Sequence, residues 1–352
     1  MRSFRKRLFR ATRTSSATAP PIAVCVIFAF CGHPSVMAVT GDTAFEISTP
    51  EVGHQLRVEN GRVASWTVQT SDRGKDQVEV FDLNGAKQLS MNPLRSSADA
   101  TRIAIWDVSV GSSGMVGIAA DYSDESGRVS SALLLYSGAD GSLLKAFSLP
   151  AEREIRKLQV GEGDRIWTLG MGSGAQDPAQ VPAIIEYDSS GSVLKQFVPR
   201  SKLGTDAVIL HEGMRFGGDV SFGIVSGWLW FYLPESRQLT RMRLDGSGLR
   251  NVTLPALPTP SSSEVLETLV RVSSLASFDR LVAHVSFREE TRNESGLFEW
   301  TEATNSWKSL PVGEVSAMSA TFVGLKDGEL ALEFFTRKAP TRRIHWVPLP
   351  SE

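Results

Sequence analysis

The residues that could do chemistry are ionisable side chains within or beside short apolar segments. Carboxylates that converge on one point can hold a hard cation such as Ca²⁺ through their oxygen atoms. The candidates include almost as many arginines as carboxylates, and nearby positive charge opposes the binding of a cation. We therefore interpret them as ligand-binding residues and predict no catalytic residue, no metal site and no cofactor. These candidates are Arg57, Asp107, Asp121, Asp124, Arg156, Glu162, Asp219, Arg271 and Arg288.

Familiar catalytic and metal-binding patterns are absent from the sequence. It contains no GxSxG or HExxH motif, no P-loop, and no GxGxxG motif at a strand-to-helix junction. Metal ligands in a repeat protein are expected at equivalent positions of the repeat, so that they converge on one point. The histidines beyond the first 38 residues stand at unequal positions of the repeat described next, so they predict no metal site. They are His54, His211, His284 and His345.

A strand-turn-strand pattern recurs along the chain and positions the candidate residues. Each copy has an apolar strand, a turn of Gly, Ser or Asp, and a second apolar strand, as adjacent antiparallel strands do. The copies follow at intervals of 50, 52, 60, 52 and 50 residues. Their anchor residues are Val58, Val108, Val160, Val220, Val272 and Phe322.

A second pair of strands follows each copy except the last, usually with its own turn. Asn84-Gly85, Asp140-Gly141, Ser190-Gly191 and Asp245-Gly246 are dipeptides that permit positive φ in such turns. Each period of about 50 residues thus supplies four strands, which is the unit of a propeller blade. The sequence therefore predicts an all-β, six-bladed β-propeller with four antiparallel strands per blade. The blades span about 52–92, 102–150, 154–200, 207–255, 264–312 and 315–349 plus 43–50.

The two ends of the repeat array predict how the ring closes. The sixth copy stops one outer strand short, while Phe45–Pro50 precedes the first copy and resembles an outer strand. An N-terminal strand that completes the last blade would remove both unpaired edges. Five or seven blades stay open as alternatives, because the fourth period diverges. The window 263–269 is the one short helical candidate.

The third period resembles the six-bladed propellers of the NHL-like and TolB-like class. The resemblance lies in LQVGEGDRIWTL followed by IIEYDSSGSVLKQF, and the looser pattern covers Val52–Pro348. It implies a fold and no particular activity. Lactonase-like members of this class hold a divalent cation in the central channel through carboxylate and amide groups. This sequence lacks a Glu and Asn pair at the corresponding positions.

Tryptophans also recur on the second strand of several periods. An aromatic stripe could bind sugar or peptide, but blades also pack face to face through bulky residues at repeated positions. We favour packing between blades as the role of Trp66, Trp167, Trp228 and Trp230.

The first 38 residues have the composition of a signal peptide. A basic segment without acidic residues precedes the apolar run Ile22–Cys31, and Val36-Met37-Ala38 predicts cleavage after Ala38. The run is too short to span a bilayer, although an uncleaved anchor is the alternative. The remaining residues 39–352 form one predicted propeller domain. It contains no cysteine, so an ordinary apolar core must stabilise it.

Charge and export limit the kinds of partner. The net charge is −2, and the first 38 residues hold six basic and no acidic residues, which leaves −8 for the rest. An acidic body disfavours nucleic acid as a partner. We predict a secreted or periplasmic, non-catalytic protein without stable membrane insertion. It would recognise a protein, peptide or saccharide on its loop-rich face. The alternative is a metal-dependent, lactonase-like hydrolase or lyase with its site at the channel mouth.

Overall fold

A computed structural model shows the arrangement of the strands. Its contacts divide the chain into two units, Met1–Met37 and Ala38–Glu352, and only the second contains described residues. The predicted signal peptide and its cleavage site thus lie outside the described part. The described residues are 44–48, 54–149, 153–172, 182–199, 220–234, 236–257, 267–274, 280–288, 293–310, 320–326, 328–335 and 341–349.

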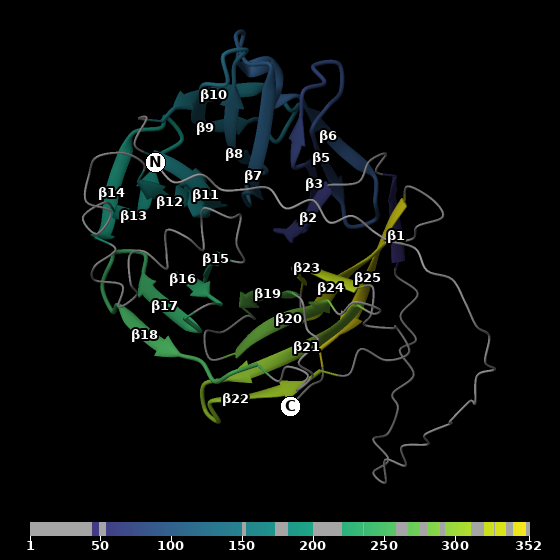
Figure 1. Ribbon diagram of the computed structural model, residues 1–352, viewed down its shortest axis with the longest axis vertical. Helices are drawn as coiled ribbons and strands as arrows, with labels where there is room; N and C mark the ends of the chain where they lie inside the picture. The colour runs from purple at the N-terminus through teal and green to yellow at the C-terminus, as the bar shows by residue number, and fades with distance from the viewer. Residues whose placement is uncertain are drawn as a thin grey trace, which may run out of the picture. The chain divides into compact units, whose positions relative to one another are not determined.

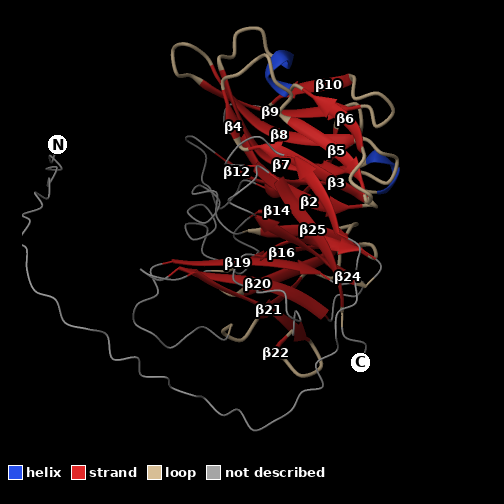
Figure 2. Cartoon of the chain, turned by 90° about the vertical axis from the view of Figure 1, so that its right-hand side faces the viewer, coloured by secondary structure: helices blue, strands red, loops and turns tan. Residues whose placement is uncertain are grey.

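The described residues form strands and two short 3₁₀ segments (Figure 2). The 3₁₀ segments are η1 (Pro93–Ser96) and η2 (Glu162–Asp164). One sheet has the order β1-β25-β24-β23-β2-β3-β5-β6. Its strands are β1 (Ala44–Ser48), β2 (His54–Glu59), β3 (Arg62–Thr67), β5 (Val78–Asp82), β6 (Lys87–Met91), β23 (Ala320–Lys326), β24 (Glu329–Phe335) and β25 (Thr341–Pro348).

The other four sheets follow one another in chain order (Figure 1). The sheet with the order β10-β9-β8-β7-β4 contains β4 (Gln69–Thr70), β7 (Arg102–Val110), β8 (Val116–Ser123), β9 (Val129–Tyr136) and β10 (Leu143–Ser148). The next contains β11 (Arg153–Val160), β12 (Ile166–Gly172), β13 (Pro182–Tyr187) and β14 (Val193–Pro199). Then come β15 (Ser221–Val225), β16 (Trp228–Leu233), β17 (Gln238–Arg243) and β18 (Arg250–Thr253). The last contains β19 (Glu267–Ser274), β20 (Arg280–Arg288), β21 (Asn293–Thr301) and β22 (Ser306–Ser309).

These sheets confirm the predicted all-β class and the repeated set of four antiparallel strands. In the eight-stranded sheet, β23-β24-β25-β1 and β2-β3-β5-β6 are two antiparallel sets. They meet at a single parallel pair, Val58 with Gly324. Strand β1 pairs with β25 from Ala44–His345 to Ser48–Thr341. The count of six blades and the closure of a ring stay predictions.

The helical expectation for 263–269 is wrong where the structure describes that window. Residues from Glu267 onward belong to β19, and Leu269 pairs with Ser286 of β20. The segment from Val270 to Ser274 continues the strand with alternating apolar and polar residues. Pairing across a sheet overrides the weak helical preference of such a short window.

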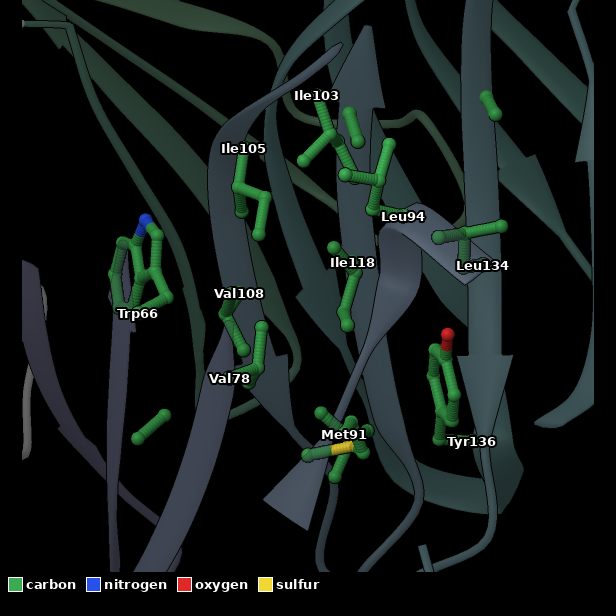
Figure 3. Packing of buried hydrophobic residues seen from close by; sticks show 14 of the residues in the cluster. Trp66, Val78, Met91, Leu94, Ile103, Ile105, Val108, Ile118, Leu134 and Tyr136 are labelled. Carbon is green, nitrogen blue, oxygen red and sulfur yellow. The ribbon is translucent and has the colours of Figure 1, made fainter. Parts of the chain in front are cut away.

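Neighbouring sheets pack face to face through apolar side chains. Between β3, β5, β6 and β7, β8, β9, the cluster includes Trp66, Val78, Met91, Ile105 and Ile118 (Figure 3). Comparable clusters join each later sheet to the next. One joins β20 and β21 to β23–β25, and another joins β23–β25 to β2, β3 and β5. Burying apolar area between the sheets is therefore the main source of stability.

Three of the four tryptophans confirm the packing interpretation. Trp66, Trp167 and Trp230 are each only 3% exposed and lie in three of the clusters between sheets. Trp228 is half-buried, and the Arg243 guanidinium lies 5.1 Å from the centre of its ring. Three of these four side chains are thus unavailable to a ligand.

Outer strands also contact the turn of the following sheet. Phe147 of β10 lies against Gly191, and Phe197 of β14 lies against Gly246. Both glycines have positive φ, +82° and +89°. The turns between outer strands therefore need glycine for two reasons, the left-handed backbone and the close approach of an aromatic ring.

Gly191→Ala tests this contact. The left-handed backbone costs a residue with a Cβ about 1 kcal/mol, and overlap with Phe147 adds about 1–3 kcal/mol. We expect the free energy of unfolding to fall by about 2–4 kcal/mol in urea titrations. Gly163→Ala is the control, because Gly163 has φ of +66° with no atom within 4 Å of its Cβ position. Equal losses in both variants would contradict the contact.

Candidate functional site

Polar side chains of the innermost strands β2, β7 and β11 form one connected cluster. Strand β2 lies beside β7, and β7 beside β11. Residues one period apart in the sequence therefore meet, as Arg57 and Asp107 do. We call the set Arg57, Glu59, Asp107, Ser109 and Gln159 the inner cluster.

Arg57 connects the three strands. Its Nη1 donates to Asp107 Oδ2 at 3.3 Å and to the Leu158 carbonyl at 3.1 Å. Its Nη2 donates to Gln159 Oε1 at 2.6 Å, and its Nε pairs with Glu59 Oε2 at 3.2 Å. One guanidinium therefore binds side chains or backbone of all three strands. It can do so because its five N–H donors point in fixed, different directions.

Side chains of β2 and β7 also hold the backbone of the next strand. Asp107 Oδ2 accepts from the Leu158 N–H at 2.8 Å, and Ser109 Oγ accepts from the Val160 N–H at 2.9 Å. Glu59 Oε2 accepts from Ser109 Oγ at 2.8 Å and from a β7 backbone N–H. These bonds satisfy N–H groups that would otherwise be buried without a partner. The inner cluster thus fastens adjacent sheets together.

Arg57 is the one cation of the inner cluster and faces two carboxylates, Glu59 and Asp107. Burial by itself lowers the pKa of Arg57, but attraction from Glu59 and Asp107 outweighs burial, so that this pKa is raised. Burial raises the pKa of Glu59, and the nearby Arg57 and Ser109 reduce this effect without cancelling it. Arg57 therefore stays charged at neutral pH. Glu59 binds a proton more readily than it would in the unfolded chain.

A second group of polar side chains, which we call the Trp106 cluster, lies between β7, β8, β9 and β11. It consists of Trp106, Asp121, Ser131, Glu154 and Arg156. The Arg156 guanidinium stacks 3.7 Å from the centre of the Trp106 ring. Asp121 Oδ2 accepts from Trp106 Nε1 at 2.6 Å and from Arg156 Nη1 at 3.2 Å, while its Oδ1 accepts from Ser131 at 2.6 Å.

β-bulges create this arrangement. The pairing of β7 with β8 skips Trp106, and the pairing of β11 with β12 skips Arg156. A bulge turns one extra side chain away from the regular alternation. The two bulges stand 50 residues apart in successive sheets, so the turned side chains meet and stack. Asp121 and Arg156 are each 10% exposed as side chains.

The two clusters confine the chemistry that their carboxylates can do. Asp107 Oδ2 accepts from Arg57 and from one backbone N–H, and both oxygens of Asp121 accept, from Arg156, Trp106 and Ser131. A general base or a metal ligand needs lone pairs that are free to meet a substrate or an ion. The arrangement instead holds strands in register and gives the centre of these sheets fixed geometry.

The structure brings together four of the nine residues predicted from the sequence. Arg57 lies with Asp107, and Arg156 with Asp121. Asp124 lies in a separate turn, where its carboxylate accepts from Ser126 Oγ at 2.6 Å, and this bond lowers its pKa.

The other predicted residues do not join these clusters in the described part. Glu162 is exposed in η2. Arg271 lies on β19 and Arg288 on β20, and only the backbone of these two residues is described, while Asp219 lies outside the described residues. The grouping of all nine at one site is thus a prediction that only the two pairs support.

Sequence reasoning missed several members of the clusters. Glu59 follows Arg57 by two residues on the same strand, and Ser109 follows Glu59 by one period of 50 residues. That spacing was a usable signal for Glu59 and Ser109. The bulges that bring Trp106 to Arg156 leave no comparable sequence signal, because a bulge depends on the pairing of two strands.

Neither a metal-ligating group of side chains nor a membrane-spanning helix occurs in the described part of the chain. Across the described residues, no group of three or more His, Cys, Asp or Glu side chains is placed to hold a metal ion. The same part of the chain contains no helix with the length and apolarity needed to cross a membrane.

The strands and their packing define a propeller-like all-β protein. No protein-family model matches the sequence, and no curated protein matches it. Among solved structures, a member of the DUF4221 family from Bacteroides vulgatus is 9% identical with a TM-score of 0.52, and the match covers 89% of this chain and 98% of that chain.

Two further solved structures are similar. A Bacteroides fragilis protein inferred to be exported is 12% identical with a TM-score of 0.49, over 84% of this chain and 90% of that chain. An oligogalacturonate lyase in complex with manganese is 10% identical with a TM-score of 0.42, over 84% and 76%. At these identities the likeness concerns the fold alone.

Asp107→Ala tests whether the inner cluster fastens the sheets. The variant leaves the buried Leu158 N–H without its acceptor and Arg57 without one carboxylate, so we expect a loss of about 2–4 kcal/mol of unfolding free energy. Asp124→Ala is the control, because it removes a carboxylate from a turn outside the inner cluster, and its effect should be clearly smaller. Equal effects in denaturant titrations would contradict the role assigned to Asp107.

Proposed function

We propose that this chain is an exported six-bladed β-propeller that binds a protein, peptide or saccharide on its loop-rich face without catalysing a reaction. The observation that carries the proposal is the use of the inner carboxylates. Oδ2 of Asp107 and both carboxylate oxygens of Asp121 accept from an arginine or from other donors of these strands, so the protein itself occupies these oxygens. Export is inferred from the basic and apolar order of the first 38 residues.

The packing supports six blades and a closed ring. Four-stranded sets follow one another along the chain, and an apolar cluster lies between each set and the next. A further cluster combines Val63 and Phe81 of the first set with Ile344 and Trp346 of the last. The pairing of β1 with β25 supplies the fourth strand of that last set. Closure of this kind leaves the first and last blades without an open face.

Loops that join second and third strands supply the proposed binding surface. The loop after β3 is long, adds β4 to β7, and is held by Arg73, which donates to the Ser97 and Ala98 carbonyls at 2.9 Å. The corresponding turn after β8 is short and is closed by Asp124. Different loops on one rigid scaffold are the usual means by which propellers and similar folds acquire binding specificity.

Deleting residues 39–50 tests ring closure. Strand β25 would lose its partner β1 and become an open edge, which promotes association with other chains. Compared with a chain that begins at Val39, the deletion variant should melt several degrees lower and aggregate on heating. An unchanged thermal midpoint with unchanged solubility would contradict closure by β1.

Arrays of peptides and saccharides probed with the labelled protein test the binding function. We expect specific binding to some of these ligands. The double variant Lys75→Glu with Arg128→Glu, which changes exposed loop residues, should bind at least about tenfold more weakly, or about 1.4 kcal/mol. Lys308→Glu, a single charge reversal of the same kind on the outer strand β22, should bind normally. Binding that the loop changes leave intact would contradict the proposed face.

Chelation separates this function from a metal-dependent hydrolase or lyase. A binding propeller without a structural ion should keep its thermal midpoint in EDTA. A bound ion whose free concentration is about 100 times its dissociation constant would stabilise the fold by roughly 2.7 kcal/mol. The chelator would remove that stabilisation. A lower midpoint in EDTA that calcium restores would favour the enzyme.

A further inference from the structure

Exposed large apolar side chains gather on two neighbouring sheets of the described part. Leu143 and Leu144 of β10 are 42% and 57% exposed, and Val193 and Leu194 of β14 are 49% and 40% exposed. Both pairs follow directly after a turn between outer strands. Val129 is also exposed, but it lies at the other end of β9 from Tyr136, which pairs with Leu143. Clustered apolar exposure marks an interaction surface more often than scattered exposure does.

The same local geometry elsewhere does not require apolar residues. The pairing of β10 with β9 skips Leu144, and the pairing of β14 with β13 skips Leu194. The pairing of β6 with β5 skips Gln88 in the same way, one sheet earlier. Gln88 is exposed and polar. The bulge therefore accepts a polar side chain. Local backbone geometry does not explain why Leu144 and Leu194 are apolar.

The two apolar pairs belong to adjoining surfaces. Phe147, at the other end of β10, lies against Gly191 in the turn that precedes Val193 and Leu194. Lys145 extends over the Phe147 ring, with its Nζ 5.8 Å from the ring centre. We call the residues Asp140, Leu143, Leu144, Lys145, Asp188, Val193, Leu194 and Lys195 the outer ridge.

The charges of the outer ridge alternate in sign and balance. Asp140 precedes the first apolar pair and Lys145 follows it, while Asp188 precedes the second pair and Lys195 follows it. Asp188 accepts from the Ser190 and Ser192 backbone N–H groups at 2.8 and 2.9 Å, which fixes its carboxylate just before the second apolar pair. A surface with this order is complementary to itself when two copies meet in opposite directions.

These features favour one kind of occupant. An anionic lipid surface attracts a positive excess, which the balanced ridge lacks. An extended peptide adds to a regular sheet edge, whereas bulges at Leu144 and Leu194 interrupt the edges of both outer strands. A second copy of the ridge offers apolar area for the leucines and an opposite charge for each Lys and Asp.

We propose that the outer ridge is a two-fold interface between two copies of this chain. The leucines of one copy pack on those of the other, and each Lys faces an Asp of its partner. The interface uses the outer strands of two sheets. It is therefore independent of the loops proposed for ligand binding, and a dimer would present two copies of that loop face.

Sedimentation velocity of the purified full chain tests the proposal. We expect a reversible dimer, and at least about a 100-fold rise in its dissociation constant in Leu144→Asp with Leu194→Asp. Lys145→Asp with Lys195→Asp should also weaken the dimer, and high salt should weaken the unaltered dimer because its ion pairs are exposed. Gln88→Asp is the matched control at the polar bulge and should leave the dimer intact.

Several results would overturn the interface. A chain that stays monomeric at high concentration contradicts it, as does a dimer that the leucine changes leave unaltered. Dissociation of the dimer by Gln88→Asp would show that the effect is not specific to the outer ridge. Binding of the monomer to anionic vesicles through the leucines would assign the ridge to a lipid surface instead. Unchanged thermal midpoints would show that each variant is folded.

Discussion

Hydrogen bonds from side chains of one inner strand to the backbone of the next hold the rest of the structure in place. Innermost strands of neighbouring sheets lie side by side without forming a regular ladder between them. Their facing N–H groups need acceptors, and Asp107 and Ser109 supply them for β11. Because a buried donor without an acceptor costs about 1–3 kcal/mol, the types of side chain at these few positions determine how closely the sheets approach.

Polar groups have different surroundings at the centre of the sheets and in the loops. The centre is fixed by carboxylates, a guanidinium and an amide that bind one another, whereas the loops carry charges that are open to solvent. Arg73 illustrates an intermediate case, because it is a loop residue that holds the loop to the carbonyls of Ser97 and Ala98. The proposed binding surface would therefore have a rigid base and loops that differ from one another at its rim. Binding there would cost little conformational entropy in the scaffold.

The sequence predicts the strands well because period and turn chemistry are local properties. The glycines at 85, 141, 191 and 246 mark turns between outer strands, and each has positive φ. Register was harder to predict. The bulges at Trp106 and Arg156 shift the alternation, so that residues assigned by counting to one face point to another. The pairing of Arg57 with Asp107 follows from the 50-residue period, whereas the stacking of Arg156 on Trp106 depends on both bulges at once.

Strand β1 pairs with a strand from the other end of the described chain. Ala44 pairs with His345, so that the first and last described strands become neighbours only after the intervening chain has been made. Contacts between residues so distant in the sequence form slowly, because the entropy of a long loop is lost before the contact is gained. Until β1 arrives, β25 is an open edge, and the exposed Arg343 on it discourages pairing with a foreign strand. Until these two strands pair, the chain is open to misassembly at the β25 edge.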